Sequence, residues 1–160
     1  MLTQAWHSER RPTIARSGRA ASGAPLKRDV RHHKIESIAV MDEQLKHYEN
    51  KLAFEIDSWD VKVAMESKEN IVVIDARSPE AFEKGHIPGA LNIPHRKINQ
   101  ETTKQIDKSA LVVTYCDGIG CNASTKGALN MAKLGFKVRE LMGGLDWWKR
   151  DGHKTDCGCE

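Results

Sequence analysis

Residues 111–135 read LVVTYCDGIGCNASTKGALNMAKLG, and this stretch decides the fold. Its first five residues form an apolar run that is typical of a strand. Cys116 follows directly, then a loop that contains glycines, and a helix is predicted from Ala123 to Leu134. This order places the Cys116 sulfur at the carboxyl edge of a strand and at the N-terminus of a helix.

The loop after Cys116 predicts a reactive thiol. Its glycines allow successive backbone N–H groups to turn toward the sulfur, and the helix dipole adds partial positive charge. We therefore expect a Cys116 pKa below that of an ordinary thiol, and alkylation at pH 7 that is faster than at Cys157 or Cys159. The alternative is an ordinary buried cysteine at a strand end. The adjacent glycines favour the catalytic interpretation, because a packed core position does not need them.

The composition is that of one soluble globular domain with a tail. The chain has 160 residues, 39% of them hydrophobic and 29% charged, which leaves room for a single core. No apolar run approaches the length that spans a bilayer, so we expect no membrane partner. Four cysteines, two in the loop and two at the C-terminus, do not form a disulfide scaffold, and this favours a reducing, cytoplasmic setting.

Both ends of the chain lack the pattern of a folded core. Residues 1–40 carry eight Lys or Arg against three acidic residues, a net charge of +5, and predict a disordered basic extension before a domain that starts at Met41. A mitochondrial-type targeting segment and a nucleic-acid-binding arm are the alternatives. An inert extension that binds no nucleic acid is favoured, because scattered charges are usually just solvated. Residues 153–160 are predicted to be a flexible tail with exposed thiols at Cys157 and Cys159.

Apolar runs alternate with helical patterns between these ends. Leu45, Tyr48 and Leu52 lie at helical spacing and predict a short amphipathic helix. The remaining elements are predicted as strands at 53–56, 71–74, 91–94, 111–115 and 136–142, and as helices at 57–65, 78–85, 123–134 and 145–150, with one or two short helices in 95–108. This alternation predicts an α/β domain with a mainly parallel sheet and helices on both faces.

Five motifs stand in a fixed order along the chain: Asp75–Phe82, Gly85–Pro94, Val113–Cys116, Leu134–Val138 and Gly143–Trp148. In order and spacing they resemble the single-domain rhodanese sulfurtransferases, over about Leu52 to Gly152. The resemblance implies a rhodanese-like domain over 41–152, with a five-stranded, mainly parallel sheet and helices on both faces. No single motif is specific, but five in order make a chance resemblance very unlikely.

The resemblance also implies an activity for Cys116. It implies that this cysteine takes a sulfane sulfur from a donor such as thiosulfate, becomes a persulfide, and passes the sulfur to a thiol or to cyanide. The implied partners are a small-molecule sulfur donor and a thiol acceptor, which could be a protein, and we expect a monomer. No metal and no organic cofactor are implied.

The loop departs from the family pattern. We expect Asp117, Gly118, Ile119, Gly120, Cys121 and Asn122 to bind substrate. The family usually has an Arg or Lys five residues past its cysteine and a Ser next, whereas this chain has Cys121 and Asn122 there, in a loop about two residues longer. Longer loops also resemble those of dual-specificity phosphatases, but no Arg lies between Cys116 and Arg139 to bind a phosphoryl group.

Two functions remain open after this departure. The first is a sulfurtransferase that works poorly with thiosulfate. The second is a non-catalytic rhodanese-like module for binding or redox sensing, in which Cys116 and Cys121 form a disulfide. Cys121 correspondingly has two possible roles, a thiol that discharges the persulfide or a small packing residue.

Residues outside the loop are predicted to support it. Asp75 and Arg77 end the strand beside the loop, and we expect a structural ion pair rather than a catalytic role. His86 belongs to a turn motif of the resembled family and is predicted to be structural. Trp147 and Trp148 are adjacent in a helix and must point to different sides, so one is expected in the core and the other at the rim of the loop.

Overall fold

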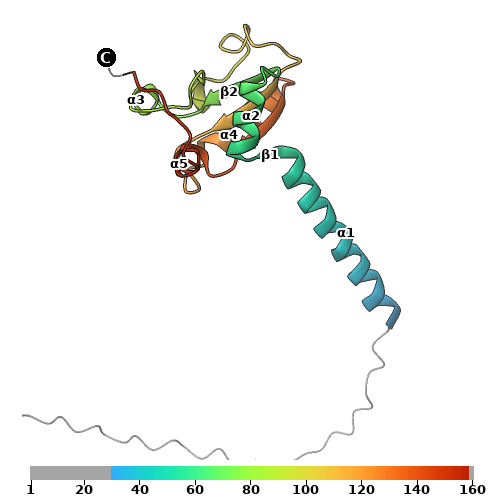
Figure 1. Ribbon diagram of the computed structural model, residues 1–160. Helices are drawn as coiled ribbons and strands as arrows, with labels where there is room; N and C mark the ends of the chain where they lie inside the picture. Colours follow the sequence, from blue (N-terminus) through green and yellow to red (C-terminus); the bar gives the residue numbers. More distant parts are fainter. Residues whose placement is uncertain (1–29, 159–160) are drawn as a thin grey trace, which may run out of the picture.

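The computed structural model describes residues 30–158 of the chain (Figure 1). The disorder predicted for residues 1–29 and the thiol predicted at Cys159 therefore lie outside the described residues. Within the described part of the chain, no helix is both long enough and apolar enough to cross a membrane.

A five-stranded parallel sheet forms the centre of the domain and confirms the predicted α/β fold. Its strands are β1 (Glu55–Ile56), β2 (Ile71–Asp75), β3 (Leu91–Asn92), β4 (Leu111–Tyr115) and β5 (Lys137–Leu141), in the order β1-β5-β4-β2-β3. β4 is the middle strand and pairs in parallel with both β2 and β5. Because a parallel sheet is buried on both faces, β2 and β4 carry continuous apolar runs.

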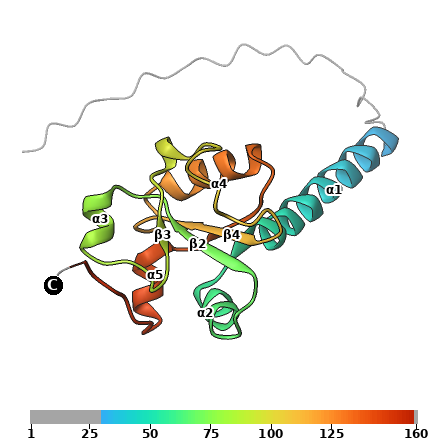
Figure 2. The same cartoon turned by 90° about the horizontal axis from the view of Figure 1, so that it is seen from above.

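Helices cover both faces of the sheet (Figure 2). They are α2 (Ser58–Glu66), α3 (Pro79–Glu83), α4 (Ala123–Lys133) and α5 (Gly144–Arg150), with the short 3-10 helix η1 (His95–Lys97). A further helix, α1 (Val30–Phe54), precedes β1. Two predicted starts are confirmed, since Asp57 caps α2 and Ser78 caps α3. Beyond η1, the segment to residue 108 forms turns rather than the second predicted helix.

The core consists of two apolar clusters, one on each face of the sheet. Neighbouring residues of a strand point to opposite faces, so Val112 packs with Met131 of α4 while Val113 packs with Trp148 of α5. Val112, Val113 and Met131 are completely buried. Burial of each such side chain stabilises the fold by about 1.5–3 kcal/mol, and this anchors the strand that delivers Cys116.

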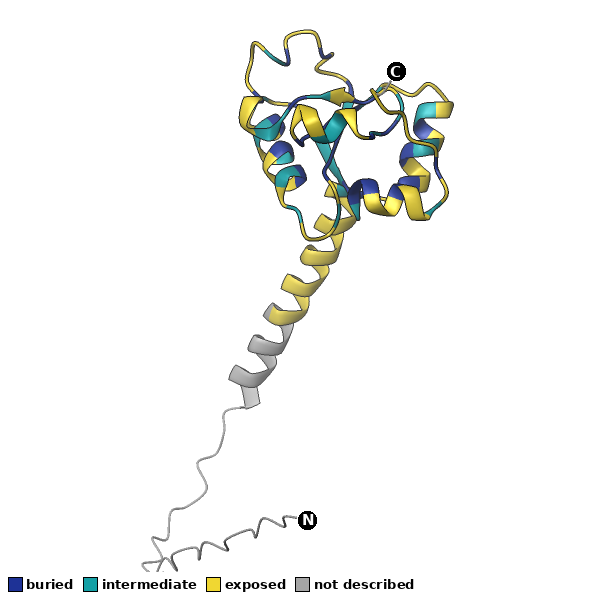
Figure 3. Ribbon diagram, turned by 90° about the vertical axis from the view of Figure 1, so that its left-hand side faces the viewer, coloured by how far each residue is buried: buried dark blue, intermediate teal, exposed yellow. Residues whose placement is uncertain are grey.

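Helix α1 differs from the short amphipathic helix that was predicted. It begins at Val30, within the segment predicted to be disordered, and it includes two residues predicted as strand. Leu45 and Tyr48 are 61% and 64% exposed, so the apolar side chains do not pack on the domain (Figure 3). The physical reason is that β1 follows Phe54 without a turn, and the helix therefore points away from the sheet (Figure 1).

The C-terminal segment 153–158 packs against the domain instead of forming the predicted flexible tail. His86 and Asp156 pair as an antiparallel bridge, and the N–H of Gly158 donates to the carbonyl of Glu83. The His153 ring is buried between aromatic side chains of α2 and α5. Backbone hydrogen bonds hold most of this segment, and because any residue can form them, they leave no signal in the sequence.

Candidate active site

Cys116 lies immediately after β4, and its side chain is buried beneath the loop that follows. Its Sγ atom lies 3.1 Å from the carbonyl oxygen of Cys121 and 3.8 Å from that of Gly118. It also lies 3.2 Å from the hydroxyl of Ser124, in the first turn of α4. The sulfur therefore stands between the carboxyl edge of the sheet and the start of a helix, as the sequence predicts.

The surroundings of Cys116 raise its pKa, so the predicted lowering is wrong. Burial is the largest cause, because it disfavours the charged thiolate, and a hydrogen bond with the Cys121 thiol raises the pKa further. Hydrogen bonds with Ser124 lower the pKa without reversing the shift. The prediction failed because it took no account of burial, which outweighs the side-chain and backbone hydrogen bonds from Ser124.

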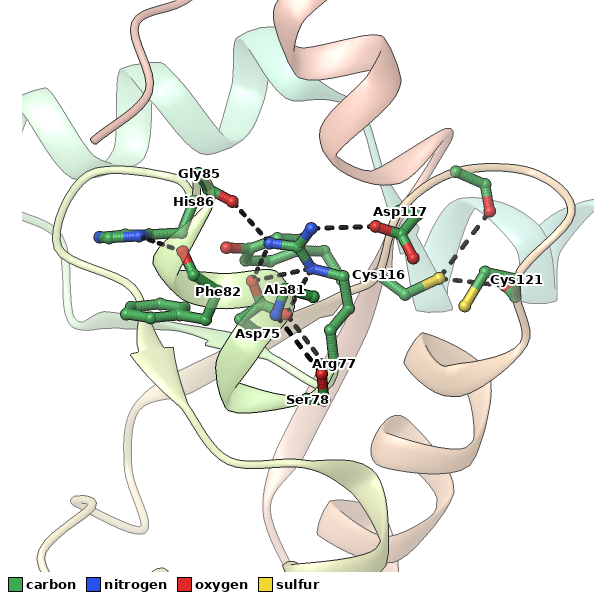
Figure 4. Close-up of polar contacts among 12 residues, drawn as sticks. Asp75, Arg77, Ser78, Ala81, Phe82, Gly85, His86, Cys116, Asp117 and Cys121 are labelled. Atoms are coloured by element: carbon green, nitrogen blue, oxygen red, sulfur yellow. Dashed lines mark hydrogen bonds and ion pairs between the residues drawn. The ribbon is translucent and has the colours of Figure 1, made fainter. Parts of the chain in front are cut away.

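The Cys121 side chain lies next to that of Cys116 (Figure 4). Both residues are free thiols in this structure. The backbone N–H of Cys121 donates to the carbonyl of Gly118 at 3.0 Å, and this turn brings the two sulfurs together. The loop therefore has the curvature that a contact between the two thiols requires.

A cavity of about 620 Å³ opens beside Cys116. Five of the loop residues predicted to bind substrate line it: Gly118, Ile119, Gly120, Cys121 and Asn122. Its other walls come from residues that sequence reasoning missed: Lys51, Glu55, Ser124, Thr125, Glu140, Leu141, Met142, Gly143 and Gly144. These residues lie on α1, β1, α4, β5 and the turn after β5, so only the folded topology brings them together.

Asp117 does not line the cavity, although it was predicted to bind substrate. Its carboxylate accepts a hydrogen bond at 2.9 Å from Arg77, whose other nitrogens bind Asp75 and the carbonyl of Gly85 (Figure 4). Burial alone lowers the pKa of Arg77, but the hydrogen bonds to the two carboxylates outweigh it and raise the pKa. Asp75 and Arg77 thus form the expected buried ion pair, and through Asp117 they hold the base of the loop.

A glycine pair after β5 holds the other side of this loop. The N–H of Leu145 donates to the carbonyl of Cys116 at 2.9 Å, and the N–H of Asp146 donates to that of Asp117 at 2.8 Å. This approach requires a glycine, because a Cβ on Gly144 would lie 2.4 Å from the Cys116 carbonyl oxygen. Gly144 also has φ of +56°, which disfavours other residues.

Glu140 of β5 organises the polar wall of the cavity. One of its carboxylate oxygens accepts hydrogen bonds from the hydroxyls of Ser124, at 2.7 Å, and Thr125, at 2.9 Å. Because the only hydroxyl proton of Ser124 goes to Glu140, its oxygen is free to accept from the Cys116 thiol. Glu140 is also the register partner of Glu55 on β1, so two carboxylates stand side by side at this wall.

The two adjacent tryptophans take the two positions predicted for them. Trp148 is 4% exposed and belongs to the core, whereas Trp147 is 42% exposed. Trp147 lines a shallow cavity together with Ile119 at the tip of the loop and Trp59 of α2. An apolar rim therefore lies outside the entrance to Cys116.

His86 stands apart from the cavity, in agreement with its predicted structural role. Its ring stacks on Phe82 with 3.7 Å between the ring centroids, and its Nδ1 lies 2.9 Å from the carbonyl oxygen of the same residue.

Within the described residues, no group of three His, Cys, Asp or Glu side chains is arranged to hold a metal ion.

Residues 60–151 match the rhodanese-like domain. This chain belongs to the rhodanese-like domain family. The match contains the cysteine loop, the Asp75–Arg77 pair and the glycine pair, and it stops short of α1 on its N-terminal side. The geometry described above is therefore that of a rhodanese-like domain.

Similar proteins include named sulfurtransferases. The thiosulfate sulfurtransferase GlpE of Coxiella burnetii is 32% identical over 103 residues, which cover 63% of this chain and 89% of GlpE. A sulfurtransferase of Allochromatium vinosum is 32% identical over 98 residues, which cover 61% of this chain and 90% of that protein. The crystal structure of BH2092 from Bacillus halodurans superposes with a TM-score of 0.69 at 40% identity and covers 73% of this chain and 86% of that one. The rhodanese-like domain described here is thus related to sulfurtransferases.

Proposed function

We propose that this protein is a sulfurtransferase that carries sulfane sulfur as a persulfide on Cys116. The observation that supports this most directly is the position of the Cys116 sulfur, which is buried at the wall of a cavity and beside the first turn of α4. The Cys116 thiolate attacks the outer sulfur of a donor, and the bond between that sulfur and the rest of the donor breaks. With thiosulfate, the leaving group is sulfite, which departs with the electron pair.

The second half of the reaction discharges the persulfide. An acceptor thiolate or cyanide attacks the outer sulfur, the S–S bond to Cys116 breaks, and the Cys116 thiolate is regenerated. The anionic outer sulfur needs hydrogen-bond donors, and the nearest are Ser124 and the first turn of α4. Ser124 can rotate its proton from Glu140 to the sulfur, because Thr125 continues to satisfy that carboxylate.

The electrostatics of the cavity support a low turnover with thiosulfate. Glu55 and Glu140 both line the cavity, and a dianion that approaches Cys116 meets their negative charges. The raised Cys116 pKa also leaves little thiolate at neutral pH. The proposal also includes a thiol acceptor on a small molecule or on a protein that meets the apolar rim. It further includes a monomeric protein in a reducing cytoplasm that keeps Cys116 as a free thiol.

Persulfide-selective labelling tests the proposal. The protein is exposed to thiosulfate or to an organic thiosulfonate, labelled, and digested, and the label is located by mass spectrometry. We expect it on the Cys116 peptide, with loss of labelling and of sulfur transfer to cyanide in Cys116→Ser. Transfer that persists in this variant contradicts the proposal, and a protein that loads with neither donor is a non-catalytic module.

A second function is favoured by the contact between the Cys116 and Cys121 thiols. The Cys121 thiolate can attack the inner sulfur of the Cys116 persulfide, which forms a Cys116–Cys121 disulfide and releases hydrosulfide. The two cysteines are oxidised in this step, and the sulfane sulfur is reduced. The protein then acts as a redox-responsive carrier that needs an external thiol to reset it.

Intact-mass measurements distinguish this second function from simple sulfur transfer. In the loaded wild-type protein, we expect the persulfide mass to decay as a disulfide-linked loop peptide accumulates. In Cys121→Ser the persulfide should form equally well and persist longer. Equal decay in both proteins, with no linked peptide, leaves Cys121 as a packing residue.

A further inference from the structure

Lys51 is the one cation among the described residues that line the cavity. It lies in the last turn of α1, outside residues 60–151 that match the rhodanese-like domain. Arg77, the buried cation nearest to the loop, is fully occupied by two carboxylates and a carbonyl. Among the described residues, Lys51 is therefore the cation placed to reach a substrate in this cavity.

The present partner of Lys51 is exchangeable. Its Nζ lies 2.6 Å from a carboxylate oxygen of Glu55, and the two side chains are 48% and 30% exposed. Ion pairs between solvent-exposed side chains contribute little free energy, so little is lost when Lys51 turns to another anion. The side chain is long and flexible enough to do so without movement of α1.

The position of Lys51 relative to Cys116 is fixed by the sheet. β1 follows α1 directly, and its Glu55 is in register with Glu140 of β5. Glu140 in turn binds Ser124, which contacts the Cys116 sulfur. Each step of this path is a strand pairing or a hydrogen bond, so the last turn of α1 belongs to the wall of the site.

We propose that Lys51 binds the charged end of the sulfur donor, and that the donor carries one negative charge on an apolar body. This inference rests on the sulfurtransferase function proposed above. Lys51 supplies one positive charge where Glu55 and Glu140 supply two negative ones, so a second charge on the donor is unfavourable. Ile119, Leu141 and Met142 add apolar walls to a cavity that is larger than thiosulfate needs. An organic thiosulfonate has this chemistry, since it presents one anionic terminus on an apolar group.

The reaction with such a donor balances in the same way as with thiosulfate. The Cys116 thiolate attacks the terminal sulfur of the thiosulfonate, and the bond between the two donor sulfurs breaks. The sulfinate leaves with the electron pair, and Cys116 becomes a persulfide. Lys51 pairs with the sulfonyl oxygens in the bound donor and with the same oxygens in the departing sulfinate, so it contributes to binding throughout the reaction.

Steady-state rates of sulfur transfer to cyanide, with benzenethiosulfonate or thiosulfate as the donor, test the role of Lys51. For Lys51→Gln, we expect KM for benzenethiosulfonate to rise about three- to tenfold with kcat within about twofold. Lys51→Arg should retain most of the affinity, and Glu55→Gln should lower KM because it releases Lys51. The wild-type protein should prefer benzenethiosulfonate to thiosulfate in kcat/KM.

Lys62→Gln is the matched control. Lys62 forms the same type of ion pair with Glu66, also at 2.6 Å, but it lies on α2 and does not line the cavity. The KM of Lys62→Gln for benzenethiosulfonate should equal that of the wild-type protein. In a second measurement, protein that is already loaded should pass its sulfur to 2-mercaptoethanol at the same rate in Lys51→Gln as in the wild type, because that acceptor needs no cation.

The outcomes separate the two proposals. If wild-type protein loads with neither donor, the sulfurtransferase function fails. If it loads, but Lys51→Gln and Lys62→Gln have the same KM, or thiosulfate is the preferred donor, the role of Lys51 fails while the sulfurtransferase function stands. A KM that rises with added salt in the wild type, and stays constant in Lys51→Gln, supports the contact.

Discussion

Cys116 is chemically protected in the resting structure. Its thiol is buried, and it faces carbonyl oxygens that accept its proton but cannot stabilise the thiolate. The hydroxyl of Ser124 is the neighbour that works in the opposite direction, and it is held by Glu140 until a charge develops on the sulfur. The residue is thus arranged to react when a substrate changes its surroundings, rather than with any electrophile that diffuses past.

Alkylation measures this protection directly. At pH 7 we expect iodoacetamide to modify the exposed Cys157 faster than Cys116, because the raised pKa leaves Cys116 mostly protonated. Below that pKa, its rate should rise about tenfold per pH unit. Cys121→Ala removes one cause of the raised Cys116 pKa, so the curve of alkylation rate against pH should move to lower pH. Ser124→Ala removes a group that lowers this pKa, so the curve should move to higher pH. Time courses followed by peptide mass spectrometry give these rates, and faster modification of Cys116 at pH 7 contradicts the structure.

The prediction for Cys116 from the sequence was right in position and wrong in electrostatics. The strand, the loop and the helix start are local features, and they placed the sulfur correctly. The depth at which the folded loop buries that sulfur depends on its backbone angles, which glycines leave open, and burial is the largest cause of the raised pKa. Composition alone therefore could not give the sign of the pKa shift.

Among the elements, the turn between β5 and α5 has a role that its length does not suggest. It joins two secondary-structure elements and also positions the first turn of α5, whose N–H groups hold the Cys116 loop. The sequence shows the glycine pair at the start of the Gly143–Trp148 motif, but its contact with Cys116 joins residues distant in the chain. The same limit applies to Lys51 and Glu140, which only the pairing of β1 with β5 brings to the cavity.

Gly144→Ala tests the importance of this close approach. The added Cβ would lie 2.4 Å from the Cys116 carbonyl oxygen, at a residue with positive φ. We expect a loss of about 2–4 kcal/mol in the free energy of unfolding. Gly120→Ala is the matched control, since nothing lies within 4 Å of its Cβ position, and it should change stability by less than about 0.5 kcal/mol. Urea denaturation measures both, and equal stability of the two variants would show that the turn can move away.

At the scale of the whole molecule, the N-terminal region and the domain are separable in stability. Residues 41–54 of α1 are all exposed, so this part of the helix adds no buried core (Figure 3). A variant that lacks residues 1–40 should therefore melt within about 2 °C of the full chain. It should also load sulfur equally well, because Lys51 is retained. Calorimetry and persulfide labelling check this, and a large loss in either would mean that the deleted residues pack on the domain.

The direct continuation of α1 into β1 has a mechanical consequence. β1 is an edge strand held by two residue pairs, Glu55 with Glu140 and Ile56 with Leu141. A pulling force on α1 therefore acts first on these two pairs and on the side chain of Ile56, which is buried in the core. Detachment carries Lys51 and Glu55 away from the cavity and leaves Cys116 in place. Tension on the N-terminal helix would thus reach Lys51, the residue that we propose for donor binding, before it reaches Cys116.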